Sequence, residues 1–162
     1  MATLSVWKFD ASSDAAEASA RLQRLTGRGG AVIHDAATVS WERAARKPTG
    51  HQLRATGSSE EISDSFWDLL FGLIFLVPLL GAAMGAATGA AAGPLTDVGI
   101  DDTFVNKVRD QITPGTSALF VLSPDTALKA VEAELAALQP VELILAHLSA
   151  EQERALRWVF TG

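Results

Sequence analysis

The residue types that most often carry chemistry are sparse in this sequence, and their spacing does not bring them together. The histidines are His34, His51 and His147, and no two of them stand at a metal-ligand spacing such as i and i+4 on one helix. His34 and Asp35 are neighbours, but adjacent strand residues point to opposite faces. The sequence contains no cysteine, which excludes disulfides and thiolate metal sites. We therefore expect no catalytic residues, no metal site and no cofactor.

The carboxylates of the TDVGIDD stretch are the next candidates for chemistry. Asp97, Asp101 and Asp102 could together bind a cation, but Asp101 and Asp102 stand where a helix is expected to begin. Negative side chains at that position cap the helix and suit its dipole. The chain carries no phosphate-binding glycine loop and no nucleophile elbow. We expect a capping role, and an enzyme or small-molecule sensor would instead need a polar cleft around His34, Asp35 and His147.

The charge of the chain also limits its partners. The formal net charge is −6 and the pI is about 5.0, so the chain lacks the cationic excess that binds phosphate backbones, and we expect no nucleic acid partner. A local basic cluster of Arg43, Arg46, Lys47 and Arg54 lies on an expected hairpin. These side chains could meet anionic lipid headgroups or simply face water.

The longest feature is an uncharged stretch over residues 69–96. Within it Gly81, Gly85, Gly89 and Gly93 recur every four residues among alanines. This spacing places the glycines on one helix face, where another helix can approach until the backbones nearly touch. Each glycine costs a helix about 1 kcal/mol relative to alanine. Close helix–helix packing would offset that cost, so the pattern predicts a glycine zipper.

The first half of the stretch is apolar on all sides, which indicates burial in protein or in lipid. Trp67, near a polar boundary, resembles an interfacial anchor. The residues that we expect to make apolar or membrane contacts are Phe66, Trp67, Phe71, Ile74, Phe75 and Val77.

The remaining pattern predicts an α+β fold. Strands are expected at 4–9, 31–42, 51–56, 117–122 and 141–147, and helices at 12–28, 101–112, 125–138 and from Ser149 onward. Around the central stretch the order is strand, helix, strand, twice. That order is the split βαβ pattern of a ferredoxin-like sheet with both helices on one face. The expected domain comprises residues 1–56 and 114–162, and the insertion comprises residues 57–113, with an apolar segment at 66–95.

This topology constrains how the apolar segment meets a membrane. A single crossing would put the two βαβ units on opposite sides of the bilayer, where they could not share one sheet. Two arrangements remain: a hairpin bent near Pro78, which is too short in each arm to span a bilayer, or a helix or hairpin that packs with copies of itself. A true single span returns only if the ferredoxin-like assignment is wrong.

Several stretches resemble an uncharacterised bacterial family, domain of unknown function 1269. They are FWDLLFGLIFLVPLLGAAMGAATGAAAG, TDVGIDDTFVNKVRDQITPGTSALFVL, VWKFD, HDAATVSWE and LSAEQERAL. The resemblance spans nearly the whole chain, from VWKFD near its start to LSAEQERAL near its end. Members are commonly labelled membrane proteins, and some relatives are linked to stress responses. The lead-in SSEEISDSFWD is more acidic than the resemblance implies. The family supplies no catalytic residues to carry over.

Our main functional hypothesis is a non-enzymatic, self-assembling protein in the cytoplasm or on the cytoplasmic face of the membrane. Its central helices would form a homo-oligomeric apolar core that is membrane-associated or encloses a lipid-like molecule. The alternative is a peripheral or re-entrant membrane protein that acts with a membrane partner. An enzyme or small-molecule sensor is the third class.

Overall fold

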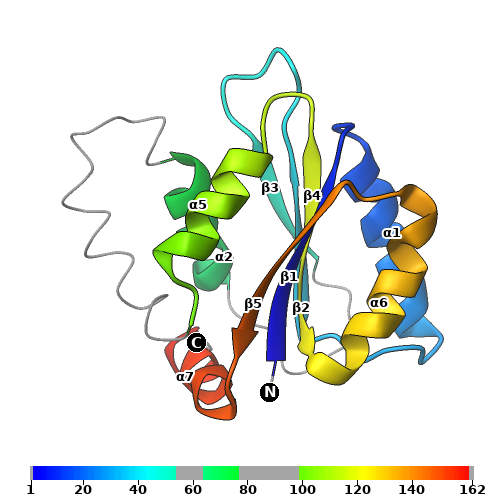
Figure 1. Cartoon of the computed structure of the whole chain (residues 1–162), viewed down its shortest axis with the longest axis vertical. Helices are drawn as coiled ribbons and strands as arrows, with labels where there is room; N and C mark the ends of the chain where they lie inside the picture. Colours follow the sequence, from blue (N-terminus) through cyan, green and yellow to red (C-terminus); the bar gives the residue numbers. More distant parts are fainter. Residues whose placement is uncertain (1, 54–63, 77–98, 161–162) are drawn as a thin grey trace.

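A computed structural model describes residues 2–53, 64–76 and 99–160 (Figure 1). The strands are β1 (Ala2–Phe9), β2 (Asp35–Ser40), β3 (Thr49–Leu53), β4 (Ser117–Pro124) and β5 (Glu142–Leu148). The α-helices of these ranges are α1 (Asp14–Gly27), α2 (Asp64–Phe71), α5 (Asp102–Gln111), α6 (Leu128–Leu135) and α7 (Ala150–Phe160). A π-helical turn, η1 (Gly72–Leu76), continues α2, and the 3₁₀ turns η3 (Asp125–Ala127) and η4 (Ala136–Leu138) flank α6.

The five strands form one antiparallel sheet in the order β3-β2-β4-β1-β5. The helix α1 connects β1 to β2, and α6 connects β4 to β5, so each connection passes over a strand that comes from the other unit. The two halves of the chain therefore interleave: β1 lies between β4 and β5, and β4 lies between β1 and β2. Neither half can complete the sheet alone.

Both faces of the strand β1 are apolar because each face contributes to a separate core. Leu4 and Val6 belong to the core on one side of the sheet, whereas Trp7 and Phe9 belong to the core on the other side. Alternation along the strand expected at 4–9 predicts the same division, with Leu4 and Val6 on one face and Trp7 and Phe9 on the other, and the structure confirms it. A strand buried on both faces needs a helical layer on each side.

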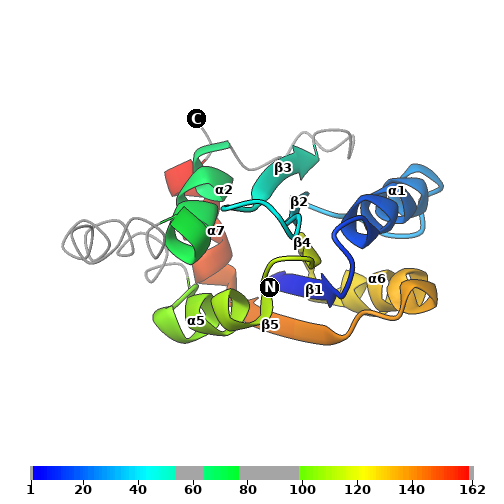
Figure 2. The same ribbon diagram turned by 90° about the horizontal axis from the view of Figure 1, so that it is seen from above.

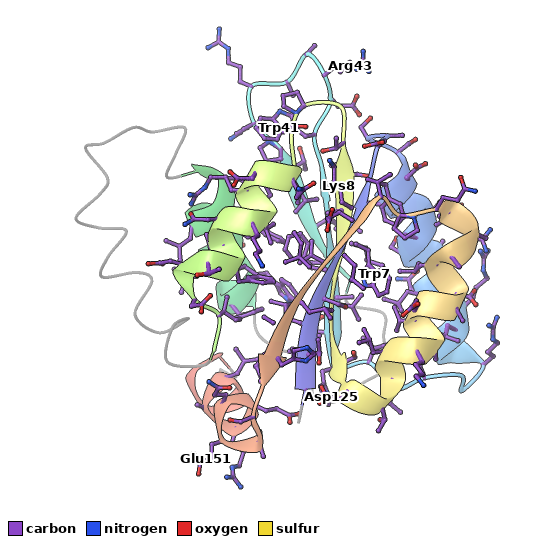
Figure 3. All side chains as sticks on the ribbon, in the orientation of Figure 1. Trp7, Lys8, Trp41, Arg43, Asp125 and Glu151 are labelled. Atoms are coloured by element: carbon purple, nitrogen blue, oxygen red, sulfur yellow. The ribbon has the colours of Figure 1, made fainter. Side chains whose placement is uncertain are left out.

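Figure 2, viewed along the sheet, shows these two layers. The helices α1 and α6 cover one face, as the sequence predicts, and contribute Leu22, Leu25, Val131 and Leu135 to its core. Trp7 points into this layer (Figure 3). The helices α2, α5 and α7, together with η1, cover the opposite face.

Two of the predicted helix starts are confirmed in detail. The side chain of Asp101 accepts a hydrogen bond from the backbone N–H of Phe104 at 3.0 Å, which caps α5. At the start of α7, Ser149 and Gln152 exchange reciprocal side-chain-to-backbone bonds of 2.8 and 3.1 Å. Serine followed three residues later by glutamine is a capping box, so this helix start was readable from the sequence.

The start of α1 differs from the prediction. For the helix expected at 12–28 the sequence offers Ser12 or Ser13 as the cap, but Ser13 has helical backbone angles and its side chain makes no capping bond. Instead, the hydroxyl of Ser117, at the start of β4, accepts from the N–H of Ala15 at 3.0 Å and donates to the carbonyl of Ala11 at 2.6 Å. A residue distant in sequence therefore closes this helix end.

The sheet also has a fifth strand beside the four predicted core strands. The hairpin arm expected at 51–56 is β3, which pairs with β2 and begins two residues earlier, at Thr49. The tripeptide Pro48-Thr49-Gly50 is a turn signal in the sequence, but Gly50 lies within this strand opposite Val39. Adding β3 extends the sheet toward α2 and gives that helix a strand to pack on.

Candidate functional site

The start of the apolar stretch packs on the protein's own sheet. We define the apolar layer as the buried side chains that α2, η1 and α5 place against the sheet. Its members are Phe66, Trp67, Leu70, Leu73, Ile74, Phe75, Phe104, Val105 and Val108. Phe66 and Ile74 are fully buried, and Trp67 and Phe75 are 2% and 5% exposed. In this arrangement their apolar contacts are made within the chain, and contact with lipid would require α2 and η1 to leave the sheet.

A buried polar bond fixes α2 to the sheet. The indole N–H of Trp67 donates to Oδ2 of Asp35 at 2.9 Å, and the N–H of Ala36 donates to Oδ1 of the same carboxyl at 2.8 Å. Asp35 is completely buried. Because a buried polar group without a partner is costly, this bond sets which part of α2 lies over β2. Trp67 thus acts in this structure as a polar anchor for the helix.

Aromatic side chains extend this anchor toward the β2–β3 hairpin. The ring of Phe71 lies 5.1 Å from that of Phe120 and 5.8 Å from that of Trp67, measured between centroids. A Cβ atom on Gly50 would lie 2.7 Å from Cδ2 of Phe71. Since real side chains do not approach so closely, glycine at this position lets the Phe71 ring rest on the backbone of β3.

Arg109 of α5 closes the end of η1. Its Nε donates to the carbonyl of Ile74 at 2.9 Å, and its Nη2 donates to the carbonyl of Leu73 at 2.7 Å. In a continuing α-helix the donor to the carbonyl of Ile74 would come from position 78, but that residue is proline and has no N–H. The guanidinium of Arg109 supplies a donor that a proline at this position cannot.

Both ends of the central stretch are therefore held by one core. Leu73, Ile74 and Phe75 precede residues 77–98, and Ile100 and Phe104 follow them. All five belong to the same buried cluster on the same face of the sheet. The stretch leaves and re-enters the domain on one side of the sheet.

Two pockets lie beside the apolar layer at the hairpin end of the sheet. One, of about 180 Å³, is lined by Trp41, Ile74, Phe75, Arg109, Ile112, Thr113 and Pro114. The other, of about 410 Å³, shares Phe75 and is also lined by Phe71 and Lys47. Lys47 is exposed, as are Arg43 and Arg46 on the same connection. Figure 3 shows Trp41 and Arg43 at this end of the molecule.

The histidines do not form a common site. Nε2 of His34 lies 3.1 Å from Oε1 of Glu153 in α7. Nδ1 of His147 lies 3.1 Å from the hydroxyl of Thr3, which donates to Asp125 at 2.5 Å. His34 immediately precedes β2, and β4 and β1 separate β2 from β5, so about 14 Å of sheet lies between these two histidines. His51 is exposed on β3.

Other predicted residues divide between the described ranges and the remainder of the chain. Within the described ranges no group of three or more His, Cys, Asp or Glu side chains is arranged to hold a metal ion. Asp68 is exposed on α2. The glycine-zipper residues Gly81, Gly85, Gly89 and Gly93 lie outside the described residues, as do Val77, Asp97, Arg54, Glu60 and Glu61. Among the helices that are described, none combines the length and apolar character needed to cross a bilayer.

Sequence reasoning missed the two contacts that position α2 and η1. The Asp35–Trp67 bond joins residues 32 apart, and the Arg109 bonds join residues 35 and 36 apart. The buried Asp35 carried a weak signal, because an acidic residue inside an apolar strand needs a donor. Arg109 carried a similar signal, because a guanidinium beside the apolar face of its helix needs hydrogen-bond acceptors.

Comparison with known proteins yields one family. No curated protein and no solved structure matches the chain. The family described as "Protein of unknown function (DUF1269)" matches residues 62–161, which is more than half of the chain. The match contains β4 and β5 but not β1, the strand that lies between them. The chain belongs to this family of proteins of unknown function.

Proposed function

We propose that this protein is a non-enzymatic, self-assembling protein whose central stretch packs with copies of itself through Gly81, Gly85, Gly89 and Gly93. The resulting apolar core lies on a membrane or encloses a lipid-like molecule. The observation that carries the proposal is the placement of both flanks of residues 77–98 in one core, on one face of the sheet. A glycine-zipper sequence whose two flanks lie on one side of a folded domain suits packing against the same sequence of other copies.

We also infer that the core of this domain is a ferredoxin-like split βαβ sheet. The order β2-β4-β1-β5, with every neighbouring pair antiparallel, supports this assignment. So does the position of both crossover helices, α1 and α6, on one face. In such a sheet β1 and β4 hold the two chain halves together, so the central stretch is an insertion that enters and leaves the same domain.

A re-entrant or peripheral membrane protein is the second candidate, and one observation favours it. The exposed cations Arg43, Arg46 and Lys47 lie on the hairpin beside the pocket formed by Phe71 and Phe75. A cationic rim next to an apolar helix end suits anionic headgroups, at about 1 kcal/mol for each basic residue near the surface. Detergent-free solubility separates the two candidates, because only the self-assembling protein buries its stretch between copies.

The zipper test replaces Gly85 and Gly89 together by leucine in the full chain. Leucine side chains keep the helix backbones apart, so the oligomer measured by light scattering without detergent is expected to fall to a smaller mass. The matched control is Gly27→Leu, where an added side chain meets open space. An unchanged oligomer mass in the double variant would remove the zipper as the assembly contact. Insolubility of the parent chain until detergent is added would favour the re-entrant candidate.

A further inference from the structure

The strand β5 is an outer strand of the sheet that the described residues form. It pairs with β1 on one side, and no described strand pairs with its other side. Alternate residues of an antiparallel edge strand turn their N–H and C=O groups away from the sheet, where they are ready to pair with another strand. Figure 2 shows β5 as the outermost strand, next to α5.

Exposed apolar side chains mark the same edge. Val141, immediately before β5, is 49% exposed, and Leu145 within β5 is 37% exposed. Among the side chains whose exposure the structure describes, the third large apolar one with such exposure is Val32. Strand alternation places Val141, Leu143 and Leu145 on one face of β5. Leu143 packs against the core beneath α1 and α6, so this face is a continuation of that core at the edge.

The other face of β5 carries a charged groove beneath α5. Two adjoining hollows of about 510 and 290 Å³ share Lys107 and Ile144 among their lining residues. Lys107 is exposed and forms no ion pair within the described ranges. Two carboxylates, Asp110 of α5 and Glu142 of β5, also line the larger hollow. A strand that carries a carboxylate opposite Ile144 would bring it beside Lys107.

We propose that β5 pairs antiparallel with β5 of a second copy of this chain, about a two-fold axis normal to the sheet, with Leu143 opposite its own counterpart. A two-fold axis of this kind keeps each residue on its own face, so it matches apolar face with apolar face. In this register Val141 lies opposite Leu145 of the second copy, and both exposed side chains become covered. Glu142 lies opposite Ile144 of the second copy and therefore beside that copy's Lys107.

The neighbouring register is less complementary. With Ile144 opposite its counterpart, Val141 would face His147, and Glu142 would face Ala146. The exposed apolar residues would then not cover one another. Only the register with Leu143 on the axis pairs Val141 with Leu145 and also brings Glu142 beside Lys107 of the second copy. The pairing joins two five-stranded sheets into one and is separate from the zipper contact.

A cysteine scan tests this register directly, because the chain has no cysteine of its own. Opposed Cβ atoms in an antiparallel pair lie about 4.5–5.5 Å apart, which is near disulfide reach. Leu143→Cys is therefore expected to form a disulfide-linked dimer under mild oxidation, at least about tenfold faster than Leu145→Cys or Val32→Cys. Faster disulfide formation by Ile144→Cys or Leu145→Cys than by Leu143→Cys would overturn the proposal. Equal rates of disulfide formation at all of these positions would overturn it too.

A charge substitution gives an independent measurement. Leu145→Lys places an ammonium group against Val141 of the second copy, and we expect the dissociation constant of the edge contact to rise about tenfold or more. The control is Val32→Lys, a more exposed apolar position away from β5 (67% against 37% for Leu145), which should leave the dissociation constant unchanged. Equal dissociation constants for Leu145→Lys and Val32→Lys would contradict the edge contact.

The two self-contacts can fail separately. If the zipper proposal is wrong and the edge proposal is right, Gly85→Leu/Gly89→Leu leaves the oligomer mass unchanged while Leu143→Cys still forms its disulfide. If the edge proposal is wrong, the disulfide is absent whatever the zipper variant does.

Discussion

Replacement of Trp67 by alanine is expected to lower the free energy of unfolding by about 3–5 kcal/mol. The substitution removes a side chain that is 2% exposed and leaves a cavity between α2 and the sheet. It also removes the N–H donor to Asp35, which is completely buried. Trp67→Phe keeps most of the ring contact but not the donor, so it should cost about 1–3 kcal/mol.

Trp41 provides the matched control for this prediction. Its ring is partly exposed, and its N–H donates to the carbonyl of Ala45 at a surface position. Trp41→Ala should therefore cost clearly less than Trp67→Ala in urea denaturation followed by circular dichroism. Equal effects of the two alanine variants would mean that α2 is not part of the folded core, and the apolar layer would then be available to lipid.

Replacement of Arg109 by methionine is expected to cost about 2–4 kcal/mol of unfolding free energy. Methionine retains a long apolar stem but donates no hydrogen bond, so the carbonyls of Leu73 and Ile74 both lose their donors. Both residues belong to the buried cluster, where water does not easily replace a lost partner. Position 78 is proline, so in an α-helical continuation no backbone N–H would be available there for the carbonyl of Ile74.

Arg154→Met is the control, since Arg154 is exposed on α7. Arg109→Lys should recover only part of the loss, because an ammonium group lacks the planar fork that reaches two carbonyls at once. Denaturation midpoints that are the same for Arg109→Met and Arg154→Met would show that the cap does not stabilise η1.

Local patterns predicted those parts of the fold whose causes are local in sequence. Alternation along β1 gave both of its faces, and Asp101 and the Ser149–Gln152 pair marked helix starts through contacts only three residues apart. The α1 cap shows the limit. Ser13 has a suitable side chain, but Ser117 is brought to the helix start by β4 and makes the bond instead.

The placement of the apolar residues was predictable only in part. The sequence showed that Phe66, Trp67, Ile74 and Phe75 must be buried, because apolar groups surround the helix. It did not show which surface buries them. That choice depends on Asp35 in β2 and Arg109 in α5, whose contacts with α2 and η1 form only when distant segments fold together. The zipper glycines lie outside the described residues, so their packing remains a prediction.

The family match contains only part of the sheet. Residues 62–161 supply β4 and β5, but these strands do not pair with each other, because β1 separates them. The first part of the chain is therefore needed to complete the sheet on which the matched part packs. A fragment that begins at residue 62 would expose both faces of an incomplete core.

Chemical labelling of the two flanks of the central stretch tests the account most directly. Asp68→Cys and Asp102→Cys each place one cysteine at an exposed position, before and after residues 77–98, in a chain without other cysteines. A membrane-impermeant maleimide is applied to intact spheroplasts, to inverted membrane vesicles and to the soluble fraction of the same cells. Because both flanks pack in one core, we expect both cysteines to react from the same side in every preparation. Reaction of one cysteine only from outside and the other only from inside would contradict it, because the two flanks could not then share one core.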